Sequence, residues 1–341
     1  MPGRIDRGAD VRRRLAFTLA GFGALTVVVC LLAPLVGSTA IHLSRVFDRS
    51  IPFADNIDAQ VFFIARLPRV VAAAIVGAGL ALSGVVFQAL LRNPLAAPDT
   101  LGVSAGATLG AMLALTAHAD FTLLGISVVP LTSFAGAVGA LVIVFALSLA
   151  RRRGTSSTVL LLGGIAIAAL LNAAGRFIQY LADVTDTFRT VQWLMGSLDV
   201  GSYAPILASL VPFGLACVGF VTLPRVLDLI SLGEEAAEAR GVDVVRTERL
   251  ALVSASLSTG AAVSLGGPVL FVGLIVPHMV RLIVGADHRL VLPASALFGA
   301  SFLIVCDLIA RTIVAPVEMP VGIITSIIGG PFFLWLLFRG R

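Results

Sequence analysis

The sequence contains no lysine, so all 24 basic residues among its 341 are arginine. A Walker A phosphate loop needs a lysine to reach the nucleotide phosphates, so the chain has no nucleotide site of that kind. Schiff-base chemistry, which needs a lysine amine, is excluded as well. If the protein works with ATP, another chain must bind it, and we expect no cofactor on this one.

Charged residues are also scarce. They form 13% of the chain against 58% hydrophobic residues, and the mean hydropathy is +1.03. A soluble domain carries about a quarter of charged residues. The three cysteines, Cys30, Cys217 and Cys306, lie far apart in apolar runs and give no metal-ligand spacing. The composition therefore predicts an all-α integral membrane protein, with 34 glycines for close helix packing.

Ten apolar runs are candidates for spans, since a spanning helix needs about 20 mostly apolar residues. Only Gly266-Gly267-Pro268 separates the seventh from the eighth, and we interpret it as a tight turn. The predicted spans are Leu15–Val36, Leu67–Leu91, Thr100–Ala117, Phe121–Ala150, Ser157–Leu181, Ala204–Leu223, Leu250–Leu265, Pro268–Val284, Leu290–Ala310 and Val321–Phe338.

The positions of the arginines predict the orientation. With ten spans and the amino terminus inside, 17 arginines face the inside, 6 face the outside and Arg176 lies within a span. Basic residues favour cytoplasmic loops, so we expect both termini in the cytoplasm and an uncleaved first span. The arginines form no continuous groove or stripe, which argues against nucleic acid as a partner.

A weak internal repeat supports a transporter. Gly84–Ala111 aligns without gaps with Gly273–Ala300, and eight positions are identical, including the first glycines and the pair Arg92 and Arg281. Each segment contains a span, an inside loop and a second span. Two related halves are common among membrane transporters.

The longest polar inside segment runs from Arg225 to Arg249. Within it, Leu232–Gly241 reads as a short amphipathic helix that ends at its final glycine. The segment is too polar to cross a membrane. It is either a solvated connector or a docking helix for a cytoplasmic partner.

Arg66 and Arg69 mark the outer entrance of the second span, and Arg311 lies at the outer end of the ninth. Such arginines can anchor helix ends at the interface. They can also form a cationic patch that receives acidic groups of an external partner. Asp307 precedes Arg311 by four residues, so a local ion pair is a third possibility.

Two polar residues fall within the fifth span. Asn172 and Arg176 are four residues apart and therefore share a helix face. Polar groups at membrane depth face protein or a water-filled cavity, which makes both candidates for a transport pathway. The spans contain no series of carboxylates for proton relay, which argues against a proton-driven carrier.

The pattern Gly102-Val103-Ser104-Ala105-Gly106 matches a serine nucleophile motif, and His278 lies on another span. An intramembrane serine protease would need such a pair. The motif normally occupies a strand-to-helix turn, whereas here it opens a helix. Gly106 and Gly110 continue it with small-residue spacing, which favours close helix packing.

Several segments, in order along nearly the whole chain, resemble the FecCD family of permease subunits. This family serves binding-protein-dependent ABC importers for iron chelates, haem and vitamin B12. The matching segments are RLPR at Arg66–Arg69, the stretch Gly77–Ala107, WLMGSL at Trp193–Leu198, LGEEAAEARGV at Leu232–Val242, the stretch Gly266–Ala300 and EMPVGIITSIIGGPFF at Glu318–Phe333.

The resemblance implies a ten-span type II ABC importer permease in which residues 1–341 form one transmembrane domain. The implied partners are a second permease subunit, two ATPase subunits carrying ATP and Mg, a periplasmic binding protein and membrane lipid. The pathway would lie at the interface of a homodimer or close heterodimer, lined by the fifth and tenth spans. Closure of the ATPases would switch it between outward and inward access.

The resemblance also implies roles for particular residues. The binding-protein docking residues would be Arg66, Arg69 and Arg311. The cytoplasmic gate would comprise Asn93, Leu95, Thr155 and Ser156. The coupling helix that contacts the ATPase would comprise Gly233, Glu234, Glu235, Ala236, Ala239, Arg240 and Gly241.

The sequence leaves the cargo open among a ferric siderophore, which we favour, haem and cobalamin. Two other classes compete with the ABC permease. A secondary transporter with repeated halves would need no ATPase-docking helix, so the polar segment argues against it. The intramembrane serine protease is the remaining alternative.

Overall fold

The computed structural model describes residues 7–119, 121–123, 126–150 and 157–339. Ten apolar helices dominate it. They are α1 (Arg7–Leu32), α4 (Leu67–Leu90), α5 (Val103–Thr116), α6 (Val128–Ala150), α7 (Ser157–Leu181), α9 (Ala204–Thr222), α12 (Val244–Gly266), α13 (Val272–Val284), α14 (His288–Thr312) and α15 (Val321–Arg339).

Shorter elements connect these helices. They are α2 (Leu43–Val46), α3 (Ile57–Gln60), α8 (Val184–Leu194), α10 (Pro224–Ile230), α11 (Glu234–Glu238), the 3-10 turns Ala33–Leu35 and Pro98–Leu101, the π-helical stretch Val61–Arg66 and a hairpin of β1 (Thr122–Leu123) and β2 (Ile126–Ser127). Among the described residues, six helices are long and apolar enough to cross a membrane, and four further apolar helices are shorter. Each of the ten predicted apolar runs corresponds to one of these ten helices.

The helix α4 occupies the centre of the bundle. Most of its side chains are buried, and it packs against α12, α13 and α14. Gly84 permits one of these contacts, because a Cβ there would lie 1.8 Å from the carbonyl oxygen of Gly273. These two glycines occupy the same position in the internal repeat, so the repeated segments meet backbone to backbone at equivalent residues.

The predicted turn at Gly266-Gly267-Pro268 is confirmed. The helix α12 ends at Gly266, Gly267 adopts a left-handed φ of 68°, and α13 begins at Val272. The carbonyl of Gly266 accepts a hydrogen bond from Ser197 N at 3.0 Å, which ties the turn to the segment after α8. Glycine is needed here because residues with a Cβ rarely adopt this backbone conformation.

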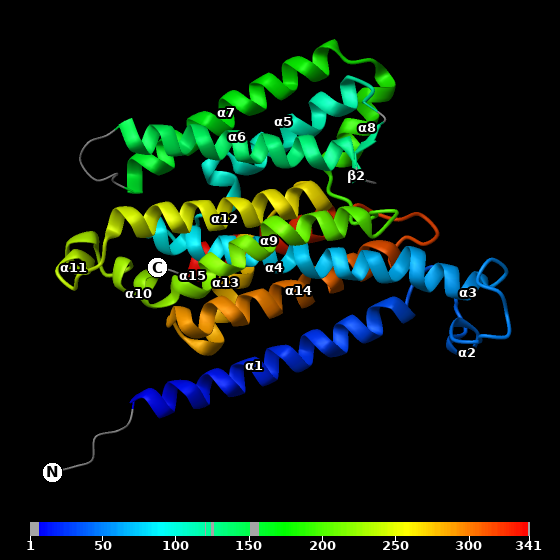
Figure 1. Cartoon of the computed structure of the whole chain (residues 1–341), viewed down its shortest axis with the longest axis horizontal. Coiled ribbons are helices and arrows are strands. Elements are labelled where there is room, and N and C mark those ends of the chain that lie inside the picture. The colour runs from blue at the N-terminus through cyan, green and yellow to red at the C-terminus, as the bar shows by residue number, and fades with distance from the viewer. Residues whose placement is uncertain (1–6, 120, 124–125, 151–156, 340–341) are drawn as a thin grey trace.

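The short helices separate the two ends of the bundle. Figure 1 shows α10 and α11 at one end, and α2, α3 and α8 at the other. The helix α1 begins, and α15 ends, toward the end that carries α10 and α11. We name that end the coupling end and the opposite end the far end. The arrangement agrees with the even number of spans predicted from the sequence.

Candidate functional site

The loop between α4 and α5 carries the predicted gate residues Asn93 and Leu95. The side-chain oxygen of Asn93 accepts a hydrogen bond from Leu95 N at 2.9 Å, and its carbonyl accepts one from Ala96 N at 3.0 Å. Arg92, just before, adopts a left-handed φ of 47°. These bonds replace the helical pattern and define a compact turn at the coupling end.

Gln88 fixes the end of α4 against α13. Its buried side-chain amide donates to the carbonyls of Gly273 and Leu274, each at 3.4 Å. The side-chain oxygen of Gln88 accepts a hydrogen bond from the guanidinium of Arg281. Arg281 is the repeat counterpart of Arg92, and it binds Gln88, one helical turn before Arg92.

Arg92 connects the predicted gate to α11. Its guanidinium is ion-paired with the carboxylate of Glu234, the first residue of that helix. Each side chain is about one-third exposed. Glu248 of α12 is buried beside the pair, and its charge interacts with both partners. The α4–α5 loop and α11 are therefore in direct polar contact.

The coupling segment is a compact unit rather than a loose connector. Ile230, Ala237 and Val244 form a small apolar cluster that joins α10, α11 and the start of α12. Ala237 is fully buried in it. Because each of the three helices contributes a side chain, we expect the segment to move as one body.

The predicted helix Leu232–Gly241 was too long. Only Glu234–Glu238 are helical, because glycines with positive φ stop the helix on both sides, at 122° for Gly233 and 80° for Gly241. A Cβ built on either glycine would meet no atom within 4 Å, so glycine is needed here for its backbone conformation and not for close packing. The exposed side of the segment comprises Leu232, Glu235, Glu238, Ala239, Arg240 and Gly241, while Glu234 and Ala236 are half-buried.

The predicted gate residues Thr155 and Ser156 lie outside the described residues. Their role and the roles of Asn93 and Leu95 as a gate stay predictions. The structure shows only that the loop carrying the latter two is held by defined hydrogen bonds at the coupling end.

The three predicted docking arginines lie together at the far end, but their guanidinium groups are used internally. Arg69 binds both carboxylate oxygens of Asp307, at 2.9 and 3.1 Å, and contacts Glu318 at 2.5 Å. Arg311 lies 3.7 Å from Asp307 and donates to the carbonyl of Ala33 at 2.7 Å. The local ion pair considered from the sequence is therefore present.

Arg66 completes this far-end cluster by donating to the carbonyls of Pro34 and Thr39. Arg66, Arg69 and Arg311 are all at most 9% exposed. Their bonds join α4, α14 and the segments that follow α1 and α14. Docking of a binding protein here stays a prediction, and any such contact would require partly exposed neighbours such as Glu318.

The predicted pathway residues lie on an open face of α7. Asn172 and Arg176 are exposed and, within the part of the chain the structure describes, form no hydrogen bond or ion pair. Large apolar side chains share the exposed surface of this helix, with Phe177 63% and Tyr180 85% exposed. An arginine without a charge partner on an apolar helix face is costly in lipid, so we expect water, cargo or a second subunit to lie against it.

The structure explains the serine motif as packing. A Cβ on Gly106 would lie 2.4 Å from the carbonyl oxygen of Gly136 in α6, so the glycines bring α5 and α6 into close contact, as predicted. Ser104 is buried, while the His278 ring packs edge-on against Phe332 of α15 at 6.0 Å. No hydrogen bond in the described residues joins the serine to the histidine.

The structure also brings together residues that the sequence did not connect. His118, Asp183 and Asp186 place an imidazole and two carboxylates within 4.8 Å of one another, where the sequence gave no metal-ligand spacing. Asp186 is buried and lies 3.3 Å from His118, and Asp183 caps α8. The cluster joins the end of α5 to the start of α8. Because its histidine is far from the two aspartates in the sequence, no local spacing predicted it.

These features define a class. The chain has ten apolar helices, and two related segments meet at a central helix. A compact polar segment is linked to a loop between spans. Together these features characterise a polytopic permease that is driven by a separate ATPase. Comparison with known proteins then gives the family. Residues 25–339 match the FecCD transport family, and the chain belongs to it.

The relatives support this assignment over almost the full length. The hemin transport system permease protein HmuU of Yersinia pestis is 38% identical over 94% of this chain and 95% of its own. The vitamin B12 import system permease protein BtuC of Vibrio cholerae is 37% identical over 96% of this chain and 95% of its own. A solved structure of a metal-chelate type ABC transporter in an inward-facing conformation has 32% identity and a TM-score of 0.80. The match covers 95% of this chain and 99% of the solved chain.

The chain is therefore a multi-pass permease subunit of an ABC importer and not an enzyme. ATP hydrolysis belongs to a separate chain, as the missing lysine predicts. Membership in the family implies ATPase and binding-protein partners. The secondary transporter and the intramembrane protease are both overturned.

Proposed function

We propose that the chain forms one half of a homodimeric permease that imports a ferric siderophore or a related iron chelate. The cargo passes from a periplasmic binding protein to the cytoplasm by alternating access, and both termini face the cytoplasm. The observation that carries this proposal is the ion pair between Arg92 and Glu234. It gives ATP-driven motion at α11 a direct route to the loop that closes the pathway.

The open faces of α7 and α15 support the dimer. In addition to the α7 side chains, Ile327 and Leu334 of α15 are 62% and 55% exposed in the single chain. A pathway between two copies would place Asn172 and Arg176 of both subunits around the cargo. The ATPases would contact the exposed side of the coupling segment, and α11 would act as the coupling helix.

The charge of the pathway supports an anionic chelate. Arg176 is the one arginine predicted within a span, and it has no carboxylate partner among the described residues. Relatives named for iron cargo include the ferric dicitrate permease protein FecD of Escherichia coli, 39% identical over 81% of this chain and 84% of its own. Oxygen-rich ferric chelates are commonly anionic, and a guanidinium attracts them before they are released.

Two experiments test the proposal. Uptake of one labelled ferric siderophore should be competed by other ferric chelates and not by cobalamin. Competition by cobalamin alone would contradict the proposed cargo.

The second experiment tests the dimer. In a cysteine-free background, Tyr180→Cys on α7 should crosslink between subunits. Leu31→Cys on α1, also exposed, is the control that should not. Equal crosslinking at both positions would contradict the dimer arrangement.

A further inference from the structure

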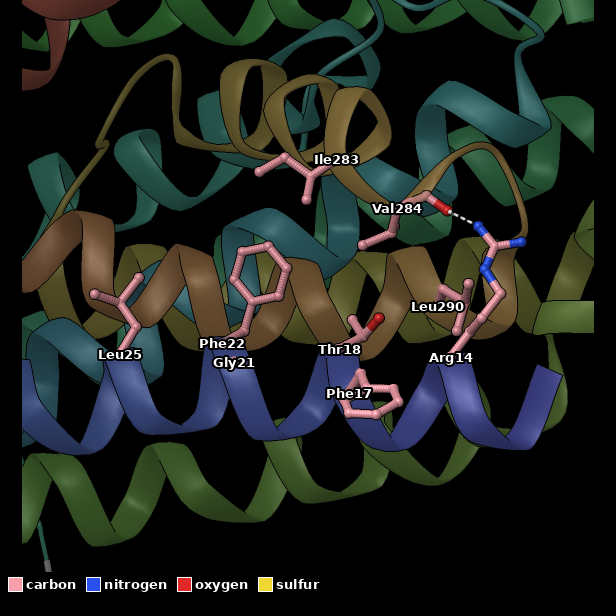
Figure 2. Close-up of a pocket in the computed structure, with 9 residues that line it drawn as sticks. All are labelled: Arg14, Phe17, Thr18, Gly21, Phe22, Leu25, Ile283, Val284 and Leu290. Carbon is pink, nitrogen blue, oxygen red and sulfur yellow. Dashed lines mark hydrogen bonds between the residues drawn. The ribbon is translucent and has the colours of Figure 1, made fainter. Parts of the chain in front are cut away.

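An apolar groove separates α1 from the rest of the bundle toward the coupling end. Its volume is about 470 Å³, and Phe17, Phe22 and Leu25 of α1 face Ile283 and Leu290 across it. Figure 2 shows these side chains around the open space, with Arg14 at one end. Volumes of this size are typical of sites for small organic ligands.

Two polar contacts frame the groove. At one end, the hydroxyl of Thr26 donates to the carbonyl of Leu297 on α14 at 3.0 Å. At the other, the guanidinium of Arg14 donates to the carbonyl of Val284, the last residue of α13, at 3.2 Å (Figure 2). Between them α1 stands away from α13, while the ring of Phe22 packs edge-on against Phe298 of α14, with the ring centroids 5.8 Å apart.

Gly21 keeps the groove open in the middle. It lines the cavity, and a Cβ built on it would meet no atom within 4 Å. Phe17 on α1 and Ile283 on α13 are each 67% exposed, so the groove opens to the surroundings of the helix. In a membrane, an apolar groove on a peripheral helix faces acyl chains, because water gains no hydrogen bonds there.

The end of the groove is cationic. Arg14 donates one hydrogen bond to Val284, which leaves most of its five N–H donors available. None of the carboxylates that form an ion pair among the described residues binds Arg14. Arg13 lies beside it, 5.6 Å from the ring centroid of Phe17, and adds a second positive charge. This guanidinium pair sits where α1 leaves the apolar layer.

We propose that the groove binds an anionic phospholipid, with one acyl chain along Gly21 and the phosphate against Arg14. The apolar walls fit the chain, and the remaining donors of the guanidinium fit a phosphodiester. Basic pockets between spanning helices at the cytoplasmic side commonly hold acidic headgroups. The lipid would connect α1 to α13 in addition to the direct packing of α1 on α14. The proposal does not depend on the cargo.

Native mass spectrometry of the permease tests this, after exchange into nanodiscs of equal phosphatidylglycerol and phosphatidylcholine. The wild type should retain phosphatidylglycerol over phosphatidylcholine by about fivefold, the effect of one arginine near an acidic headgroup. Arg14→Gln should reduce the preference to near unity. Gly21→Leu should abolish retention of both lipids, because its side chain fills the space that the acyl chain would occupy.

Gly23→Leu is the matched control. Gly23 also meets no atom within 4 Å of a built Cβ, but it does not line the groove. This variant should bind lipid as the wild type does, and thermal unfolding of all three variants checks that they fold. Equal retention by Gly21→Leu and Gly23→Leu would overturn the proposal. Equal retention of both lipids by the wild type would also overturn the proposal, as would a polypeptide bound in the groove.

Discussion

The carboxylate of Glu234 and the guanidinium of Arg92 form an ion pair that joins α11 to the loop between α4 and α5. Glu234 begins the five-residue helix of the coupling segment, and Arg92 directly precedes the predicted gate residue Asn93. The pair therefore directly connects the surface predicted to meet the ATPase to the loop predicted to close the pathway.

The variants Arg92→Gln and Glu234→Gln should separate ATP hydrolysis from transport. A partly exposed ion pair contributes only about 0.2–1 kcal/mol, so the melting temperature should change little. Uptake per ATP hydrolysed should fall severalfold because the gate loop no longer follows α11. The charge-swapped double variant Arg92→Glu with Glu234→Arg should recover part of the loss. Full uptake in both single variants would show that the pair carries no motion.

The far-end cluster predicts an asymmetry between two acidic residues that contact Arg69. The side chain of Asp307 is 2% exposed, whereas that of Glu318 is 47% exposed. Removing one partner of a buried ion pair costs about 3–5 kcal/mol, so Asp307→Asn should lower the stability strongly. Glu318→Gln should cost about 1 kcal/mol or less. Thermal unfolding in detergent measures both, and equal shifts would contradict the assigned burial.

Charge reversal at Arg66 or Arg69 should affect folding as well as any docking of a binding protein. Both side chains are nearly buried and donate to groups of this chain. Binding-protein affinity therefore has to be compared at equal amounts of folded permease. If affinity then remains unchanged, the docking prediction for these residues is wrong, and their role is structural.

Gly84 should tolerate no side chain. A Cβ at this position would lie 1.8 Å from the carbonyl oxygen of Gly273, and that atom is backbone and cannot rotate away. Overpacking typically costs about 1–3 kcal/mol, and Gly84→Ala should lower the melting temperature accordingly. Gly139→Ala in α6 is the control, because a Cβ there meets nothing within 4 Å. Equal stability of the two variants would refute the close approach.

Arg176→Gln should slow the import of an anionic chelate by about tenfold or more, since charged hydrogen bonds contribute about 1.5–3 kcal/mol. Because the side chain is exposed and unpaired among the described residues, expression and stability should be retained. Arg45→Gln, which removes one exposed arginine from α2, is the charge-matched control. Normal uptake by Arg176→Gln would place this residue outside the pathway.

The sequence predicts the fold well because hydropathy and charge follow single segments. Ten apolar runs became ten helices, and the turn at Gly266-Gly267-Pro268 appeared where glycine and proline marked it. The boundaries were less accurate. Helical structure begins at Ile57, well before the predicted second span at Leu67, because a π-helical stretch joins α3 to α4.

The site was predicted only in part, since its contacts depend on packing between distant segments. The spacing of Asp307 and Arg311 suggested their ion pair, but nothing local showed that Arg69 would bind the same carboxylate. Likewise, the repeat paired Arg92 with Arg281 without indicating their different partners, Glu234 and Gln88. Sequence spacing predicts contacts between residues on the same helix, whereas contacts between residues on different helices are seen only in the structure.

The central claim is that this permease moves its cargo only when ATPase motion reaches the α4–α5 loop. Reconstitution in proteoliposomes with its ATPase and binding protein tests it directly, with uptake of a labelled ferric siderophore as the measurement. The account predicts uptake with ATP and none with a hydrolysis-deficient ATPase. Uptake that persists without ATP hydrolysis, or that follows an imposed proton gradient, would contradict it.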